Sequence, residues 1–180
     1  MLRPIAQGVI VALLAASAPF VRAQAAEQTF QFDCDVPPGK FSDWSGTVAP
    51  GLTGISGRIE LLEPRSHKRW IPTAGVWLAR GDERVGLQLS VIAATPDVVQ
   101  VYVYRSRENG ERTLLTTVPW RAHPIAFTLS YETSGDLKLT VEGKEAPLGM
   151  TGFHPEKLSL SCSTAQFKFI DVVVTSAADK

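Results

Sequence analysis

Residues 85–104 read VGLQLSVIAATPDVVQVYVY, and this stretch contains the pattern that decides the fold. Apolar residues occupy every second position in two runs, which are Leu87, Leu89, Val91 and Ala93, then Val99, Val101 and Val103. Such alternation is typical of β-strands that turn one face toward a core and the other toward solvent. We therefore predict two strands here, joined by a turn at Thr95-Pro96-Asp97.

The same alternation recurs through most of the chain. It appears at 30–34, 55–61, 74–78, 125–131, 137–141, 158–162 and 167–174. Turn-forming residues separate these runs at Arg80-Gly81-Asp82, Glu108-Asn109-Gly110, Ser134-Gly135-Asp136 and Glu142-Gly143-Lys144. No amphipathic helix is evident after residue 25. About ten strands at this spacing predict an all-β protein, either a two-sheet antiparallel sandwich or a barrel.

Two segments interrupt the alternation. Residues 35–51 form a connection rich in proline, glycine and serine that contains Phe41 and Trp44. Residues 63–69 form a basic loop directly before Trp70. Long connections in compact β-domains are often functional. Because the strand pattern resumes on both sides, we interpret neither segment as a linker between domains.

The composition is that of a folded protein without a large charge of either sign. Of 180 residues, 44% are hydrophobic, and 18 lysines and arginines balance 18 aspartates and glutamates. An apolar content near the globular average excludes intrinsic disorder. The zero net charge argues against nucleic acid as a partner, because domains that bind it through bulk charge are strongly basic.

The N-terminal segment has the features of an export signal. The basic start Met1–Arg3 precedes an apolar run, Ile5–Phe20, and Ala23-Gln24-Ala25 offers a small-x-small cleavage site. The run is shorter than the roughly 20 apolar residues that cross a membrane. We predict a cleaved signal helix over 1–25 and a single β-sandwich domain over 26–180. The mature protein is then periplasmic or secreted, without stable membrane insertion.

The two cysteines, Cys34 and Cys162, lie near the two ends of the expected domain. In an exported chain, an even number of cysteines indicates a disulfide first. The alternatives are buried free thiols or a shared metal ion, although two cysteines without a nearby histidine make a poor zinc site. A bridge around most of the domain contributes about 4–5 kcal/mol in the chain-entropy model.

A family resemblance lies in the second half of the chain. Residues 123–148, HPIAFTLSYETSGDLKLTVEGKEAPL, contain an aromatic strand, a Gly-Asp turn, a Leu-x-Leu-x-Val strand and a Glu-Gly turn. This hairpin resembles that of the concanavalin A-like jelly rolls, which include laminin G-like domains and many glycan-active proteins. Residues 167–174 resemble the closing strand of that superfamily. The resemblance implies a jelly roll in which the strand near Phe30 lies beside the closing strand, bringing Cys34 and Cys162 together. We therefore expect a disulfide between them to join the terminal strands of the sandwich.

The catalytic motifs of the superfamily are missing from the sequence. Its glucanases resemble one another in a Glu-x-Asp-x-x-Glu strand, and no Glu-x-Asp occurs here. Its alginate-type lyases carry Arg-x-Glu-Leu, Gln-x-His and Tyr-rich strands, and only the first has a counterpart, Arg58-Ile59-Glu60-Leu61. We interpret Arg58 and Glu60 as a solvent-facing pair on a strand. A Gly-x-Ser-x-Gly nucleophile motif is absent as well.

Metal-binding patterns are weak. The three histidines, His67, His123 and His154, do not have the spacing of metal ligands. Calcium is the alternative to consider, because jelly rolls often bind it through loop carboxylates. The candidate carboxylates, which we interpret as ordinary turn and cap residues, are Asp33, Asp35, Asp43 and Asp171. We expect no metal site and no cofactor.

One face of the predicted sheet collects aromatic and polar side chains. If the alternating apolar residues point into the core, their neighbours point outward. This parity places five residues of three successive strands on one surface, which we predict to bind a ligand: Trp77, Gln88, Gln100, Tyr102 and Tyr104. Aromatic rings beside amides and hydroxyls suit sugars, and tryptophan and tyrosine also anchor protein partners. The alternative is that these side chains only cover the sheet beneath a loop.

These observations favour an exported, non-catalytic binding module that recognises a glycan or an envelope protein. Two alternatives stay open. One is a polysaccharide hydrolase or lyase with an unrecognised site, and the other is a structural protein of the envelope without a small ligand. The sequence thus predicts the fold and the compartment more sharply than the activity.

Overall fold

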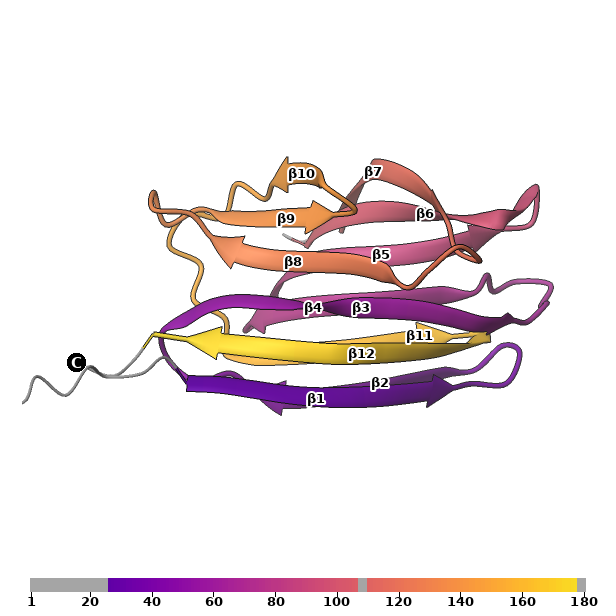
Figure 1. The fold of residues 1–180 in the computed structure, drawn as a ribbon, viewed down its shortest axis with the longest axis horizontal. Helices are drawn as coiled ribbons and strands as arrows, with labels where there is room; N and C mark the ends of the chain where they lie inside the picture. Colours follow the sequence, from indigo (N-terminus) through magenta and orange to yellow (C-terminus); the bar gives the residue numbers. More distant parts are fainter. Residues whose placement is uncertain (1–25, 107–109, 178–180) are drawn as a thin grey trace, which may run out of the picture.

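The computed structural model describes residues 26–106 and 110–177 and shows two facing β-sheets (Figure 1). The predicted signal helix at 1–25 and residues 108–109 of a predicted turn lie outside the described residues. Among the described residues, no helix is long and apolar enough to span a bilayer. Their twelve strands are β1 (Ala26–Asp35), β2 (Phe41–Thr47), β3 (Leu52–Pro64), β4 (Thr73–Arg80), β5 (Glu83–Ile92), β6 (Thr95–Ser106), β7 (Glu111–Pro119), β8 (Ile125–Tyr131), β9 (Leu137–Val141), β10 (Lys144–Pro147), β11 (Lys157–Ser163) and β12 (Ala165–Ser176).

Each sheet has six strands. We call the sheet with the order β1-β12-β3-β8-β9-β10 the back sheet and the sheet with the order β2-β11-β4-β5-β6-β7 the front sheet; in the view of Figure 1 the front sheet is the more distant of the two. Every strand pair is antiparallel, which confirms the predicted two-sheet antiparallel sandwich. The first and last strands are neighbours in the back sheet, where Phe32 lies opposite Phe169, as the family resemblance implied.

The alternating apolar residues fill the space between the sheets. Phe127, Phe167 and Phe169 of the back sheet are fully buried in one cluster with Leu87 and Leu89 of the front sheet. Burial of one such side chain contributes roughly 1.5–3 kcal/mol, so this layer provides most of the drive to fold. The intervening residues face outward, and the front sheet therefore has a continuous outer face.

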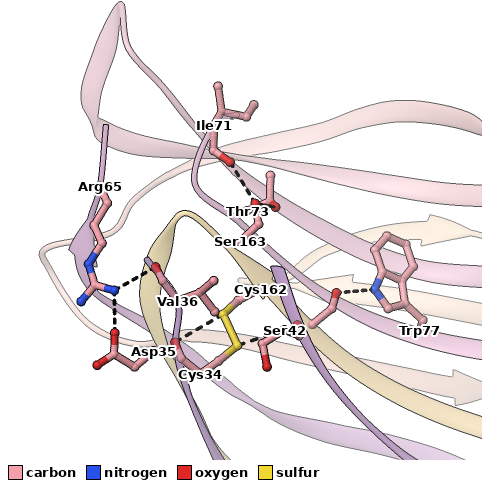
Figure 2. Close-up of a disulfide and its surroundings, with 11 residues drawn as sticks. Cys34, Asp35, Val36, Ser42, Arg65, Ile71, Thr73, Trp77, Cys162 and Ser163 are labelled. Atoms are coloured by element: carbon pink, nitrogen blue, oxygen red, sulfur yellow. Dashed lines mark hydrogen bonds and ion pairs between the residues drawn. A yellow bond between two sulfur atoms is a disulfide. The ribbon is translucent and has the colours of Figure 1, made fainter. Parts of the chain in front are cut away.

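The predicted disulfide between Cys34 and Cys162 is present, with the two Cα atoms 6.2 Å apart. Cys34 belongs to β1 of the back sheet and Cys162 to β11 of the front sheet (Figure 2). The expectation that the bridge joins the terminal strands is therefore corrected. Backbone hydrogen bonds already join β1 to β12, and the disulfide instead ties the two sheets to each other.

Three details of the predicted strand pattern are corrected. Residues 35–51 contain the strand β2, and β7 is a second strand that the pattern did not indicate. Both are edge strands of the front sheet with mostly exposed side chains, so they carry little alternation. The strand β6 begins at Thr95, which moves the turn from Thr95-Pro96-Asp97 to Ala93 and Ala94.

Candidate functional site

The outer face of the front sheet carries all five residues predicted to bind a ligand. Strand register aligns their side chains in rows: Gln88 lies opposite Tyr102, and Gly86 lies between Trp77 and Tyr104. Gln100 lies in the next row on the same face. The structure thus brings the five residues onto one surface, and their binding of a ligand stays a prediction.

Trp77 forms part of the floor of this surface. Its indole lies over Gly75, where a Cβ atom would overlap the ring. Its Nε1 donates a 2.8 Å hydrogen bond to the Oγ of Ser161 (Figure 2), and its ring meets Tyr104 edge to face at a centroid distance of 5.0 Å. These contacts leave Trp77 half-buried, so it is not the protruding anchor that parity alone suggested.

The polar groups of the predicted site bond to one another along their strands. The Nε2 of Gln88 donates to the Oγ of Ser90 at 3.2 Å, and the hydroxyl of Tyr102 donates to the Oε1 of Gln100. The guanidinium of Arg112 lies over the ring of Tyr102, with 4.9 Å between Cζ and the centroid. Side chains fixed in this way lose less conformational freedom when a ligand binds.

A groove of about 330 Å³ opens on this face, at the lower end of the range of roughly 300–1,000 Å³ that is common for ligand pockets. Trp77 and Gln88 are among its lining residues, whereas Gln100, Tyr102 and Tyr104 lie on the same face outside the lining. The lining also includes residues outside the predicted set, above all Phe41, Arg69, Trp70, Arg112, Ser161 and Ser163.

Two exposed aromatic side chains stand at the groove. Phe41, the first residue of β2, is 62% exposed, and Trp70, shortly before β4, is 52% exposed. Exposed apolar side chains rimmed by polar groups are typical of interaction sites. Because their rings are open to solvent, both side chains can stack on the apolar face of a ligand.

The strand β11 holds the C-terminal end of the loop that carries Trp70. The Oγ of Ser163 donates to the backbone oxygen of Ile71 at 3.3 Å and lies 3.1 Å from the Oγ1 of Thr73 (Figure 2). Cys162 lies between the groove residues Ser161 and Ser163 and is buried. The disulfide therefore fastens the strand that forms part of the groove floor.

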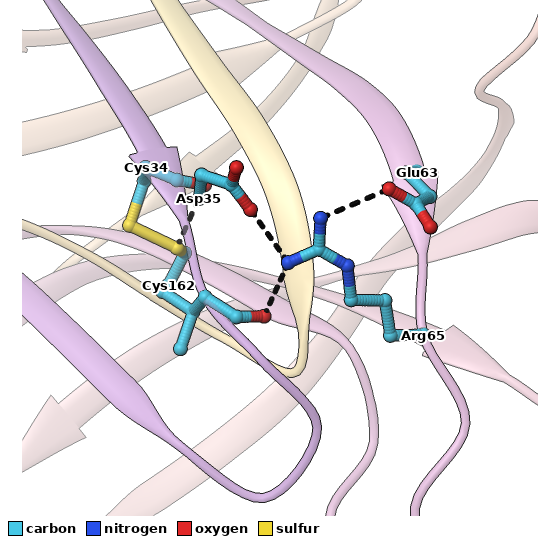
Figure 3. Close-up of polar contacts among 6 residues, drawn as sticks. Cys34, Asp35, Glu63, Arg65 and Cys162 are labelled. Atoms are coloured by element: carbon cyan, nitrogen blue, oxygen red, sulfur yellow. Dashed lines mark hydrogen bonds and ion pairs between the residues drawn. A yellow bond between two sulfur atoms is a disulfide. The ribbon is translucent and has the colours of Figure 1, made fainter.

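Arg65 holds the N-terminal end of the same loop (Figure 3). Its guanidinium donates to the Oδ1 of Asp35 at 2.6 Å, to the backbone oxygen of Val36 at 2.8 Å and to the Oε2 of Glu63 at 2.9 Å. The hydrogen bonds with Glu63 and Asp35 raise the pKa of Arg65 above its ordinary value. Since the segment after Asp35 leads into Phe41, Arg65 connects the two segments that carry the exposed aromatic rings.

The groove lining offers aromatic, hydroxyl, amide and guanidinium groups. No aspartate or glutamate belongs to that lining as the structure describes it. Across residues 26–106 and 110–177, no three histidine, cysteine, aspartate or glutamate side chains gather as a metal-binding group. Of the aspartates considered for calcium, Asp35 is paired with Arg65 and Asp171 with Arg58.

Some of the groove residues outside the predicted set could have been found from the sequence, and others could not. Ser161 and Ser163 follow from parity, because Leu160 and Cys162 of the same strand point inward. Phe41 and Trp70 lie in or beside the two segments that interrupt the alternation, but nothing in either segment indicates that they meet. Their convergence depends on the sheet order and on the contacts of the connecting loops.

No protein-family model and no curated protein matches the sequence. Among solved structures, β-agarase A of Zobellia galactanivorans has a TM-score of 0.55 at 10% identity, covering 83% of this chain and 73% of the agarase chain. The CBM2 module of an evolved Dit protein from Lactobacillus casei BL23 phage J-1 has a TM-score of 0.53 at 9% identity, with coverage of 82% and 83%. An alginate lyase of Pseudomonas aeruginosa has a TM-score of 0.53 at 8% identity, covering 71% of this chain and 66% of the lyase chain.

These neighbours define the fold class. The chain shares the fold of these structures, an antiparallel jelly-roll sandwich, as the hairpin at residues 123–148 implied. At such low identities the likeness extends to the fold alone, and one fold hosts many activities. The function has to be argued from the groove itself.

Proposed function

We propose that this protein is an exported, non-catalytic module that binds a glycan in the groove of the front sheet. The observation that carries the proposal is the pair of exposed rings, Phe41 and Trp70, beside a polar floor that contains Gln88 and Ser161. Sugar rings present apolar C–H faces, which stack on aromatic side chains, and hydroxyls, which bond to amides and hydroxyls.

Two further observations support the proposal. The structural neighbours include an agarase, an alginate lyase and a CBM2 module, so some proteins with this fold act on or bind carbohydrates. The Cys34–Cys162 disulfide supports an extracytoplasmic location, because disulfides persist in oxidising compartments.

The two tryptophans at the groove differ in exposure. Trp70 is open to solvent and free to stack on a sugar, whereas Trp77 is half-buried and packed against the sheet. We expect Trp70→Ala to weaken glycan binding by about 1–3 kcal/mol, as for an exposed aromatic anchor, with little change in the free energy of unfolding.

A glycan array followed by calorimetry on the glycans retained tests the proposal. The variants are Trp70→Ala and Phe41→Ala, and the matched control is Leu62→Ala, which removes an exposed apolar side chain from β3 of the back sheet. We expect both groove variants to lose affinity and the control to keep it. Failure to retain any glycan, or an unchanged affinity of Trp70→Ala, would overturn the proposal.

Catalysis is the competing function, and a turnover assay distinguishes it. A lyase produces unsaturated sugar ends that absorb ultraviolet light, and a hydrolase produces new reducing ends. Incubation of the protein with alginate, agarose and every glycan retained on the array should give neither product. Turnover that disappears in a groove variant would show that the protein is an enzyme and not only a binding module.

A further inference from the structure

Two arginines line the groove without a carboxylate partner among the residues that the structure describes. Arg69 comes from the loop before β4 and Arg112 from the edge strand β7. Within the part of the chain that the structure describes, neither forms an ion pair with an aspartate or glutamate. Asp43 lies on the same face, beside Ser161, but outside the groove lining. The groove therefore carries an uncompensated positive charge.

Four other arginines are paired with a carboxylate, whereas Arg84 and Arg105, which lie outside the groove lining, have no such partner among the described residues. Those with an aspartate or glutamate partner are Arg58, Arg65, Arg80 and Arg121. Pairing of this kind neutralises a guanidinium and occupies its N–H donors. In the groove, by contrast, the charge and the donors of Arg69 and Arg112 remain available to a ligand.

Arg112 is also held in place before any ligand binds. Its guanidinium stacks over the ring of Tyr102, 4.9 Å from the centroid, and the hydroxyl of Tyr102 is in turn bonded to Gln100. A guanidinium is planar, and its fork of N–H groups matches the two oxygens of a carboxylate or sulfate. This pre-organisation reduces the entropy that binding costs.

We infer that the glycan is anionic, with carboxylate or sulfate groups that bind Arg69 and Arg112 while its sugar rings stack on Trp70. The inference rests on the proposed glycan-binding function and adds the chemical class of the ligand. Uronic acids and sulfate esters provide the same chemistry, an oxyanion that accepts paired N–H donors.

A panel of acidic and neutral glycans tests the inference in the intact protein. It contains uronate polysaccharides with their methyl-esterified forms and sulfated polysaccharides with their desulfated forms. The variants are Arg69→Gln, Arg112→Gln and the double variant that combines them. The matched control is Arg58→Gln, which removes the same charge from β3 of the back sheet.

We expect the glycans that bind most tightly to be acidic, and to bind roughly tenfold more tightly than their neutralised forms at low salt. The difference should shrink as salt is added, because exposed charges are screened. Arg69→Gln and Arg112→Gln should each remove a large part of the preference for the acidic form, and Arg58→Gln should leave it unchanged. A preference for uronate over its methyl ester identifies the anion as carboxylate, and a preference for the sulfated over the desulfated form identifies it as sulfate.

Two results would overturn this inference without overturning the proposed function, and a third would overturn both. Equal affinity for acidic and neutral glycans, with both lost in Trp70→Ala, would overturn the anionic class and leave glycan binding intact. Preference for acidic glycans that survives in the Arg69→Gln/Arg112→Gln double variant would also overturn the assignment. Absence of binding to any glycan would overturn the proposed function and this inference with it.

Discussion

The indole of Trp77 and the hydroxyl of Ser161 are joined by a 2.8 Å hydrogen bond that crosses from β4 to β11 on the outer face of the front sheet. Both residues line the groove, and Ser161 is only 7% exposed. A half-buried tryptophan bonded to a neighbouring strand stabilises the sheet as well as forming the groove floor. Its removal therefore affects folding and binding together.

Replacement of Trp77 by alanine should lower the free energy of unfolding by about 2–3 kcal/mol, less than the roughly 3–5 kcal/mol that removal of a fully buried aromatic costs. The loss arises from the contacts with Gly75 and Tyr104 as well as from the bond to Ser161. Chemical denaturation measures it. A change below about 0.5 kcal/mol, as at an ordinary surface position, would contradict the half-buried placement.

The hydrogen bond itself can be isolated with a double-mutant cycle of Trp77→Phe and Ser161→Ala. Each single change should cost about 1 kcal/mol, because each leaves a polar partner unsatisfied. The double variant should cost less than the sum of the two, since both changes remove the same bond. Strict additivity in urea denaturation would show that the two side chains act independently.

The disulfide should contribute more than any single side chain to stability. Cys34 and Cys162 are 128 residues apart in sequence, and a closed loop of that size contributes about 4–5 kcal/mol in the chain-entropy model. We expect the Cys34→Ala/Cys162→Ala double variant to lose about this amount in guanidinium denaturation. A reducing agent should produce the same loss in the wild type and none in the variant, and equal sensitivity of both would contradict the prediction.

Glu142 makes stability depend on acid pH. Burial alone would raise the pKa of Glu142, but the backbone N–H of Ala126, 2.6 Å from its Oε1, and the ring of His123 outweigh it and lower that pKa below 4.5. A carboxylate with a lowered pKa stabilises the fold above its unfolded pKa, and this stabilisation disappears as the pH falls through the lowered value.

The Glu142→Gln variant should therefore be less stable than the wild type near pH 5, and the difference should shrink toward about pH 3. Urea denaturation at several pH values measures the difference. Glu27→Gln is the control, because Glu27 is an exposed carboxylate on the edge strand β1. A Glu142→Gln difference that is the same at pH 5 and pH 3 would exclude the proposed role of the carboxylate.

Parity explains why so much of the front sheet could be predicted from the sequence. In the inner strands β4, β5 and β6, one face packs on the core, so alternate apolar residues reveal which side chains point outward. This argument alone predicts that Trp77, Gln88 and Tyr102 share one face. The same argument fails for β2 and β7, because an edge strand with mostly exposed side chains needs no apolar face.

The sequence does not predict that the exposed rings of Phe41 and Trp70 meet at the groove, and the reason is different. Phe41 and Trp70 are far apart in sequence and lie in or beside irregular segments without periodicity. They meet at one groove only because β2 lies next to β11 in the front sheet and because Arg65 ties the two segments together. Such tertiary contacts between loops leave no local pattern in the sequence.

Arg65 should be a positioning residue for the groove, because it holds the loop of Trp70 against the segment that precedes Phe41 without lining the groove itself. We expect Arg65→Ala to accelerate tryptic cleavage after Lys68 and Arg69 and to weaken glycan binding, while the protein stays folded by circular dichroism. Arg65→Lys should be intermediate, since one ammonium cannot replace a planar fork that donates to several acceptors. The control is Arg121→Ala, which breaks the exposed pair with Asp97. Cleavage and affinity that match the wild type in Arg65→Ala would show that the loop keeps its position without this guanidinium.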